Sequence, residues 1–576
     1  MAEQRSAAAL VLLLALVLSV PAPTTDGPMS TSAALAAPGS PDPLTVEGPV
    51  RFSGDDATLL AVDGRRYRGV IELTDSGRVV NDVDIEGYVA GIAEMPSRWP
   101  LAALEAQAVA ARTYAWWSAE AAVHDGYDIC DTVACQVYRG AEVLLDGGER
   151  WGAAVEATAG QVLVGDDDRP ILARYFSTSG GRTYDAEEVF PATGARDYLV
   201  AIDDPYDEVS PYHRWEVPFT RAEFDEILSR GERLAATVPV AAVERTGAVD
   251  DVSANFVVRA RDGTEVEVGA VELRDFLSRV AVSRFPDRFP TARADGLRPL
   301  PSTVPSSRFT VEVTSDTVVL HGRGWGHGVG MGQYGARGRA QAGYDATEIL
   351  AAYYGGREPV GADDLPERIR VGLTAPRDEV VIAGDDVLRI EAGGEVVVAR
   401  AIGPWTATYE QGRWRLAPPP GGERDLEVAP TRVVEALSRP GEVIAVEAEV
   451  DAHALLRLEV RDGGDELVRT HHLGVVEPGI HTARWRITDD DGAVVPPGRY
   501  RVALIGEDAA GARAGVPVEV ELGPGDLPGP TEGEGAGSTA PLASGTLPLS
   551  VITVALVLAL LAATLLALRL ARRSSS

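Results

Sequence analysis

Residues 94–117 read E-M-P-S-R-W-P-L-A-A-L-E-A-Q-A-V-A-A-R-T-Y-A-W-W, and this stretch decides how the first half of the chain folds. The Ala-rich run after Pro100 predicts a long helix, because alanine has the highest helix propensity and proline is tolerated in the first turn. A shorter helix is expected over residues 85–94, so that Glu94 stands where this first helix stops.

Glu94 is the first candidate for chemistry. An acid at the C-terminal end of a helix faces the negative end of the helix dipole, which raises its pKa. A carboxyl group with a raised pKa can act as a general acid at neutral pH. The alternative is an ordinary helix-ending glutamate in water.

The composition limits the classes of function. A chain of 576 residues is long enough for three or four domains, and a hydrophobic content of 45% predicts that most of it folds. The net charge of -33 opposes binding to nucleic acids and to anionic lipid headgroups. The chain has no lysine, since all 53 basic residues are arginine, and this excludes Schiff-base and Ser-x-x-Lys chemistry.

Both ends of the chain carry apolar runs. We expect a secretory signal peptide and leader over residues 1–36, because Arg5 precedes an apolar run that ends in Pro-rich small residues. Residues 549–568 carry no charge over about 30 Å of helix, which is long enough to span a membrane. Arginines in the tail, residues 569–576, predict that this tail is cytoplasmic and that the preceding chain is extracellular.

Turn dipeptides and changes of periodicity divide the rest of the chain and predict an α+β protein. Mixed strands and helices over residues 45–356 are followed by a β-rich extension over residues 357–435. Residues 440–522 show strands with D-G and P-G turns, which predict a small β-sandwich. Residues 523–548 are rich in Gly, Pro and Ser and predict a flexible linker.

A glycine-rich segment over residues 321–338 reads H-G-R-G-W-G-H-G-V-G-M-G-Q-Y-G-A-R-G. Glycine lets a backbone approach a ligand closely, and the interleaved aromatic rings offer flat faces to sugars or bases. The side chains expected to contact a ligand are Trp325, His327, Gln333 and Tyr334. The alternative is a tight, glycine-packed turn. The G-x-G-x-x-G subset at residues 330–335 is not a dinucleotide site, because no acid follows it about 20 residues later.

A third segment, Y-F-S-T-S-G-G-R-T over residues 175–183, places three hydroxyl groups before a Gly-Gly pair. These groups could bind a polar ligand at the end of a strand. The candidate contacts are Ser177, Thr178, Ser179, Gly180 and Gly181. A serine nucleophile is the rival hypothesis, but no G-x-S-x-G elbow is present. A plain turn explains the segment equally well when it is considered alone.

Together these three segments resemble the SpoIID/LytB family. The family pattern of a catalytic E-M-P followed by Q-A-V-A-A-R-T-Y is found at residues 94–96 and 107–114. The S-T-S-G-G element and the G-x-G-W-G-H-G-V-G-M-x-Q-Y-G-A signature are present as well. The resemblance covers about residues 50–356 and implies a SpoIID-type catalytic domain over residues 45–356. Residues 440–522 resemble the immunoglobulin-like domain of flagellar hook-capping proteins, on D-D-x-G and P-P-G-R-Y.

The resemblance implies a function at the bacterial cell wall. Family members that are enzymes are lytic transglycosylases, which cleave peptidoglycan glycan strands stripped of their stem peptides. Others are described as enhancers of a cell-wall amidase. With the two apolar ends, this implies a type I single-pass protein of the cell membrane whose ectodomain faces the wall. The expected partners are glycan strands and a cell-wall amidase or another wall protein, and neither a cofactor nor a nucleic acid is expected.

The implied mechanism needs one acid. Glu94 would protonate the glycosidic oxygen between N-acetylmuramic acid and N-acetylglucosamine, and would then accept the proton of the muramic C6 hydroxyl as that oxygen closes onto C1. The product would be a 1,6-anhydro sugar. Arg112, a charge on an apolar helix, is expected either to pair with a carboxylate or to position the sugar, because an unpaired buried charge is costly. The second hypothesis is a non-catalytic wall-binding protein that stimulates an N-acetylmuramoyl-L-alanine amidase.

The chain has two cysteines, Cys130 and Cys135. Outside the cytoplasm such a pair favours a disulfide. The resemblance implies an alternative, since some family members bind zinc with a His/Cys cluster in this loop, and His124 with the two cysteines matches three ligands. A structural zinc site normally has four protein ligands, and Ala134 stands where a histidine would be expected. We therefore favour the disulfide and assign no metal.

Overall fold

The computed structural model describes residues 43–286, 288, 304–373, 378–419, 426–435 and 443–524. The expected signal peptide and the expected membrane span at residues 549–568 lie outside these residues. Within the described part, no helix combines the length and the apolar character that a membrane crossing needs. The described chain is α+β, with a β-rich C-terminal region, as the sequence predicts.

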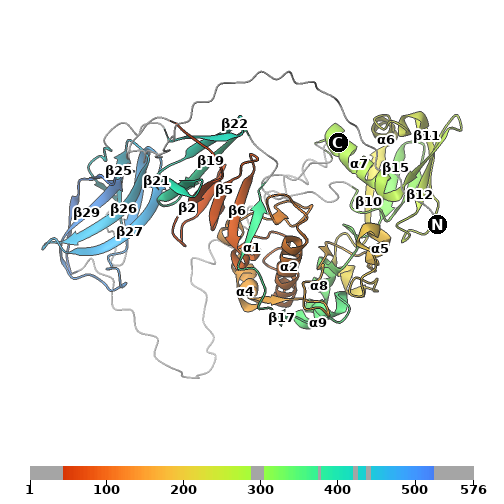
Figure 1. The fold of residues 1–576 in the computed structure, drawn as a ribbon, viewed down its shortest axis with the longest axis horizontal. Helices are drawn as coiled ribbons and strands as arrows, with labels where there is room; N and C mark the ends of the chain where they lie inside the picture. The colour runs from red at the N-terminus through yellow and green to blue at the C-terminus, as the bar shows by residue number, and fades with distance from the viewer. Residues whose placement is uncertain are drawn as a thin grey trace, which may run out of the picture.

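Three hydrophobic cores follow one another along the molecule (Figure 1). Two sheets cover the central core. In each sheet, strands that are neighbours in the order below are hydrogen-bonded to each other. The first sheet contains β21 (Glu395–Ala401), β20 (Leu388–Ala392), β2 (Val50–Ser53), β5 (Val70–Leu73), β6 (Val79–Asp84), β18 (Arg368–Gly372) and β7 (Ile129–Cys130). The second contains β1 (Leu44–Val46), β23 (Arg413–Ala417), β22 (Trp405–Glu410), β19 (Glu379–Gly384), β3 (Leu60–Val62) and β4 (Arg65–Tyr67).

Strands from the expected β-rich extension, residues 357–435, pair with strands from the start of the chain in both sheets. In the first sheet Arg368 of β18 pairs with Asp84 of β6, and β20 pairs with β2. In the second sheet β19 pairs with β3. A domain boundary at residue 356 would cut through both sheets, so the extension and the N-terminal strands form one unit. Local sequence patterns do not reveal pairings between segments so far apart in the chain.

Helices fill the other side of the central core. The main ones are α1 (Ile85–Ala90), α2 (Leu101–Ala121), α4 (Glu149–Ala157), α8 (Gln333–Gln341) and α9 (Ala346–Tyr353). Helix α2 packs against the four others. Thirteen of its 21 residues are buried, which requires neighbours on several sides, and its many alanines let them approach. Shorter elements nearby are α3 (Glu142–Leu145), β8 (Gln161–Val162), α5 (Ala186–Val189), η1 (Pro191–Thr193) and β17 (Val360–Gly361).

Helix α1 is shorter than predicted. The Asp84 side chain accepts a hydrogen bond from the Gly87 N–H at 2.7 Å and so caps its start. The helix ends at Ala90, because Ile92 leaves it to form a β-bridge with Tyr138. The helix predicted over residues 85–94 is therefore four residues too long, and Glu94 lies in the loop between α1 and α2.

The second core belongs to a unit inserted between residues 212 and 322, which we call the inserted unit. Its elements are β10 (Trp215–Thr220), α6 (Arg221–Leu228), η3 (Leu234–Thr237), β11 (Val240–Arg245), β12 (Asn255–Ala260), β13 (Glu265–Gly269), α7 (Ala270–Arg284), β14 (Phe309–Val313) and β15 (Thr317–Gly322). They form two three-stranded sheets, β10-β15-β14 and β11-β12-β13. The glycine-rich segment begins at the end of β15, where the chain returns from the inserted unit to the central core.

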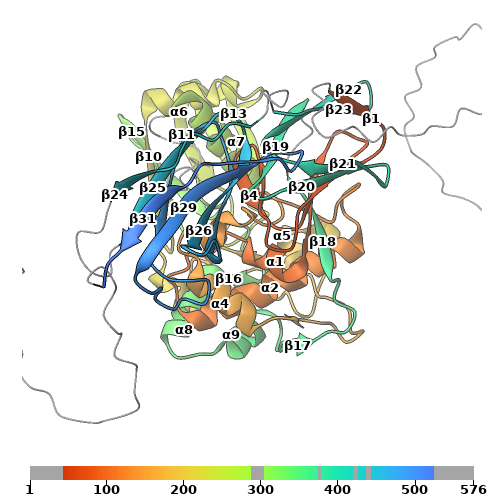
Figure 2. The same ribbon diagram turned by 90° about the vertical axis from the view of Figure 1, so that its left-hand side faces the viewer.

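The third core fills a C-terminal β-sandwich (Figure 2). One sheet contains β24 (Arg432–Glu435), β25 (Ile444–Val450) and β28 (Gly479–Trp485). The other contains β27 (Leu467–Val476), β26 (Ala454–Asp462), β29 (Gly498–Glu507), β30 (Arg513–Ala514) and β31 (Val518–Leu522). An ion pair of 2.7 Å between Arg400 on β21 and Glu507 on β29 joins the sandwich to the central unit.

Helix α8 is held in place by glycines that allow very close packing. A Cβ atom on Gly338 would lie 2.0 Å from the Tyr206 backbone oxygen in η2 (Pro205–Val209). A Cβ atom on Gly335 would lie 2.0 Å from the Tyr353 hydroxyl of α9. Real Cβ atoms do not approach other atoms this closely, so any larger residue would push α8 away from η2 and α9.

Gly338→Ala is therefore expected to destabilise the protein. Overpacking costs about 1–3 kcal/mol, and the gain of about 1 kcal/mol in helix propensity offsets only part of it. We expect a lower midpoint of the calorimetric unfolding transition for this variant. The control is Gly361→Ala, because nothing lies within 4 Å of a Cβ atom placed there. A Gly338→Ala protein that unfolds at the wild-type temperature would contradict the packing argument.

Candidate active site

Glu94 lies where three parts of the central unit meet. The α1–α2 loop carries its side chain, and one carboxylate oxygen, Oε1, accepts a hydrogen bond of 2.8 Å from the Val137 backbone N–H. The other oxygen, Oε2, faces the amide of Gln333, the first residue of α8, at 3.5 Å. This second contact is long and therefore weak, so Oε2 is the oxygen that remains available to hold a proton.

The surroundings of Glu94 favour its protonated form. Burial raises the pKa of this carboxyl group above its ordinary value, while the hydrogen bonds from Val137 and Gln333 oppose the rise. No other charge among the described residues contributes to the shift. The sequence predicted a raised pKa for a different reason, the dipole of a helix ending at Glu94. That reason is wrong, because α1 ends at Ala90 and burial is the cause.

One buried donor near this carboxyl group has no partner among the described residues. The Gln333 amide also reaches Gln107 Oε1 at 3.3 Å, but Gln107 Nε2 makes no hydrogen bond to any described residue. The Tyr175 hydroxyl is buried as well, and it interacts with the Gln136 side chain. Burial raises its pKa well above the ordinary tyrosine value, and the nearby Glu94 adds to the rise. Buried polar groups are nearly always paired in native proteins, so an unpaired donor beside an acid indicates a place for a ligand.

The sequence alone did not predict a role for Gln107 or Tyr175. Gln107 lies inside the quoted 94–117 stretch, and its signal is an amide in a run of apolar residues that becomes the buried α2. Tyr175 opens the third segment and forms β9 (Tyr175–Phe176), which pairs in parallel with β16 (Met331–Gly332). That pairing places the third segment directly beside the glycine-rich segment.

His327 serves this pairing and is not placed to exchange protons with Glu94. Its Nε2 lies 3.0 Å from the Tyr175 carbonyl oxygen, and its Nδ1 accepts a hydrogen bond of 3.1 Å from the Val329 N–H. These partners assign a neutral ring with the proton on Nε2. The ring also packs against Phe176 and Phe190, and burial lowers its pKa to about 4. His327 therefore holds the backbone of Tyr175, and this geometry does not support a direct substrate contact.

The hydroxyl segment divides into buried and accessible groups. Asp207 accepts hydrogen bonds from the backbone N–H groups of Ser179 at 3.0 Å and Gly180 at 2.8 Å. Gly180 and Gly181 both have positive φ, at +66° and +103°, which favours glycine. Thr178 bonds the Ser210 hydroxyl at 2.8 Å. These contacts fix the turn.

Ser177 differs, because its side chain is only partly buried. Its backbone oxygen accepts a hydrogen bond of 3.0 Å from the Tyr334 N–H, which brings it close to α8. Of the predicted hydroxyl contacts, Ser177 is the one that the structure leaves accessible beside the acid.

Two aromatic candidates of the glycine-rich segment, Tyr334 and Trp325, contact different parts of the molecule. Tyr334 packs edge-on against Trp99, with ring centroids 4.8 Å apart, next to Gln333 and the α1–α2 loop. Trp325 packs against Tyr212 at 4.2 Å and contacts the core of the inserted unit. Glu94, Gln333 and Tyr334 are thus brought together, whereas Trp325 is joined to the inserted unit.

Arg112 is fully buried in α2, and its guanidinium group is already occupied. It forms a two-point ion pair with Glu86 of α1, with Nε 2.9 Å from Oε1, and it also donates to the Gln161 carbonyl oxygen at 3.0 Å. Of the two roles expected for Arg112, the structure shows pairing with a carboxylate. It does not bring Arg112 to a surface where a sugar could bind.

The cysteine loop contains a disulfide between Cys130 and Cys135, as the sequence favoured. The His124 Nε2 atom lies 3.3 Å from the Cys135 sulfur, so the histidine and both sulfur atoms are close together. The disulfide occupies both sulfurs, and metal binding by cysteine needs free thiolates.

Comparison with known proteins assigns the family. The sequence model "Stage II sporulation protein" of the SpoIID family matches residues 74–164, and the "FlgD Ig-like domain" model matches residues 436–509. Stage II sporulation protein D of Bacillus subtilis is 30% identical over 49% of this chain and 76% of that protein. An uncharacterized protein of Brachyspira hyodysenteriae is 32% identical over 54% of this chain and 76% of its own length. The chain belongs to the SpoIID family, and its C-terminal sandwich is a FlgD Ig-like domain.

One relative carries a different name. The amidase enhancer of Bacillus subtilis is 29% identical over 52% of this chain and 44% of that protein. Among solved structures, FlgD from P. aeruginosa aligns at 19% identity with 16% of this chain and 65% of its own, at a TM-score of 0.14. A score that low assigns no fold, so the identity of the sandwich depends on the sequence match.

The ion pair between the fully buried Arg112 and the partly exposed Glu86 yields a test of stability. Arg112→Met removes this pair and leaves the Gln161 carbonyl oxygen without its donor, while Glu86 keeps the Gly160 N–H, so the expected cost is below the value of about 3 kcal/mol for a fully buried pair. We expect this loss in the unfolding free energy of the central unit, measured by denaturant titration with hydrogen exchange of α2. Arg169→Met is the control, because Arg169 pairs with Glu120 on the same helix but is 68% exposed. Equal effects of the two substitutions would refute a structural role for Arg112.

Proposed function

We propose that this protein is a lytic transglycosylase that cleaves the bond between N-acetylmuramic acid and N-acetylglucosamine in peptidoglycan strands. The observation that carries the proposal is the partly buried Glu94 side chain, whose carboxyl group has a raised pKa. Membership in the SpoIID family supports a role at the cell wall. A protonated Glu94 Oε2 would donate its proton to the glycosidic oxygen as the bond from that oxygen to the muramic C1 breaks.

The same carboxylate then acts as the base. The muramic C6 hydroxyl attacks C1 and gives its proton to Glu94, so the acid is restored, a 1,6-anhydro ring forms and no water is consumed. The charge that develops on the sugar ring is balanced by the carboxylate that has just lost its proton.

The electrostatics of the site favour a single acid. Glycoside hydrolases normally use two carboxyl groups about 5–9 Å apart. Two other carboxyl groups have a pKa raised by burial to about 6, those of Asp131 and Asp204. Neither contributes to the pKa of Glu94. Asp204 instead accepts a hydrogen bond of 2.9 Å from Tyr353, which ties η2 to α9.

A second candidate function is stimulation of an amidase without catalysis. The relative named amidase enhancer favours it, because stimulation of an amidase does not require proton transfer from Glu94. The two functions differ in whether Glu94 is required.

We also propose that residues 549–568 anchor the protein in the cell membrane, with the described residues outside and an amidase or another wall protein as a partner.

Glu94→Gln is expected to abolish bond cleavage while the protein stays folded. Glutamine keeps an acceptor for the Val137 N–H but cannot donate the proton, and loss of a general acid costs about 10²–10⁴ in rate. The assay is mass spectrometry of anhydro products released from stripped glycan strands by the full-length protein. Glu105→Gln on α2 is the matched control and should retain activity. If Glu94→Gln cleaves normally, or stimulates an amidase while wild type releases no product, the transglycosylase proposal fails.

The pH dependence of cleavage follows from the raised pKa of Glu94. The reaction begins with the protonated acid, so kcat/KM should be highest below this pKa and should fall as the pH rises through it. Burial moves that fall to a higher pH than an exposed glutamate would give. His327, with its pKa lowered to about 4, adds no step near neutral pH. A rate that instead rises with pH across this range would show that Glu94 is needed ionised.

A further inference from the structure

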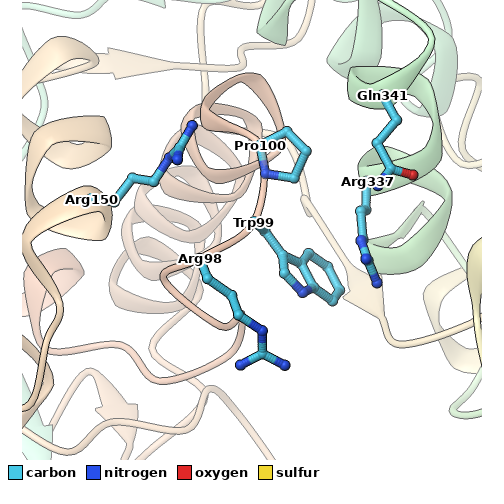
Figure 3. A pocket seen from close by; sticks show the side chains of 6 residues that line it. All are labelled: Arg98, Trp99, Pro100, Arg150, Arg337 and Gln341. Carbon is cyan, nitrogen blue, oxygen red and sulfur yellow. The ribbon is translucent and has the colours of Figure 1, made fainter. Parts of the chain in front are cut away.

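A pocket of about 350 Å³ lies beside the candidate active site and is lined by arginines (Figure 3). The residues that line it are Arg98, Trp99, Pro100, Arg150, Arg337 and Gln341. The α1–α2 loop and the start of α4 form one side, and α8 forms the other. Trp99 lies between Arg98 and Arg337 (Figure 3).

The three guanidinium groups have no acidic partner among the residues that the structure describes. Most arginines of the described chain pair with a carboxylate, as Arg112, Arg357 and Arg370 do. Arg98, Arg150 and Arg337 form no such pair, and the Arg337 Nε is buried without a hydrogen bond. In a chain with a net charge of -33, three unpaired arginines around one pocket create a local site for an anion.

The pocket is built on aromatic rings that also border the acid. The Arg337 guanidinium carbon lies 5.2 Å from the Trp99 ring centroid and 5.8 Å from that of Tyr334, which orders this arginine. Burial raises the pKa of the Tyr334 hydroxyl, and the positive charges of Arg337 and Arg98 oppose that rise. Both arginines are therefore close to the Tyr334 side chain.

The two walls of the pocket continue into the two walls of the acid site. Gln333, which faces Glu94, and Arg337 are four residues apart on α8 and so lie on the same face of the helix. Arg98 follows Glu94 by four residues in the α1–α2 loop, a span of at most about 14 Å. A polymer bound at Glu94 would therefore place its neighbouring units in the pocket.

We infer that this pocket is a subsite for a carboxylate of the glycan strand, held by Arg98, Arg150 and Arg337 while Trp99 contacts a sugar ring. The inference rests on the proposed function, because it takes peptidoglycan as the polymer. N-acetylmuramic acid differs from N-acetylglucosamine by a lactyl ether that ends in a carboxyl group. That group is free in a strand without stem peptides, and a strand with stem peptides carries other carboxylates on the peptides. Arginine suits either source, because its planar fork bonds a carboxylate at two points.

The test measures binding and does not depend on turnover. The full-length Glu94→Gln protein is titrated with stripped glycan strands, with peptide-bearing strands and with a chito-oligosaccharide of equal length, which has the same backbone but no carboxylate. Arg98→Gln/Arg150→Gln is the main variant, because both side chains are exposed and their loss should not unfold the protein. Arg261→Gln, which removes one exposed arginine of the inserted unit, is the control for loss of a positive charge outside the pocket.

We expect the double variant to bind a carboxylate-bearing strand about tenfold more weakly, with no change for the chito-oligosaccharide and none for the Arg261→Gln control. A loss confined to stripped strands identifies the lactyl carboxylate as the ligand, and a loss confined to peptide-bearing strands identifies a stem-peptide carboxylate. Arg337→Lys, which keeps the charge but loses the fork, should weaken binding of the same strand.

Equal losses for all three polymers, or no loss for any, would overturn the carboxylate subsite. Neither outcome would touch the proposed cleavage, which is measured separately by the anhydro products of the wild-type protein. Conversely, a protein that releases no product but shows the selective loss would retain the subsite and lose the transglycosylase assignment.

Discussion

The candidate site depends on the burial of one carboxyl group without a cation to neutralise it. Among the described residues Glu94 meets a backbone N–H and a side-chain amide, both uncharged. A paired arginine would lower the pKa of this group and keep it ionised, as a buried partner does for a structural acid. Arg112 of α2 does not do this, because Glu86 and the Gln161 carbonyl oxygen occupy its guanidinium group and it makes no contribution to the pKa of Glu94. The separation of these two charges leaves the acid free to exchange a proton.

Close packing of glycines brings the other parts of the site to that acid. The glycine-rich segment lies against the hydroxyl segment, since a Cβ atom on Gly330 would lie 2.0 Å from the Arg174 carbonyl oxygen. The parallel pairing of β9 with β16 and the bond from His327 to Tyr175 hold the same two segments together. The dense glycine pattern that suggests ligand contact is therefore explained first by backbone packing. The ligand-facing groups are carried at its end, on Gln333 and Tyr334.

Local signals predicted the α+β class, the long helix after Pro100 and the β-rich C-terminal segment, because each depends on neighbouring residues. The motif resemblance correctly gave the family and identified Glu94 and Gln333, which the structure brings together. The pairing of strands from residues 357–435 with the first strands was missed, because it joins segments nearly 300 residues apart. The free donor of Gln107 was missed for another reason. Whether a buried amide or hydroxyl is unpaired depends on its three-dimensional neighbours, which no local pattern contains.

The arginine pocket and the acid site share the same two walls, the α1–α2 loop and α8, and this affects how a glycan strand would be held. Each wall carries one group of the acid site and one arginine, Glu94 with Arg98 on the loop and Gln333 with Arg337 on α8. A displacement of either wall would therefore change both sites together. If a carboxylate bridges the arginines of the two walls, it draws the walls towards each other and shortens the weak 3.5 Å contact at Glu94 Oε2. A shorter contact stabilises the ionised carboxylate and lowers the pKa of Glu94, so binding of the correct polymer would promote release of its proton, whereas a neutral chitin strand would leave that contact loose.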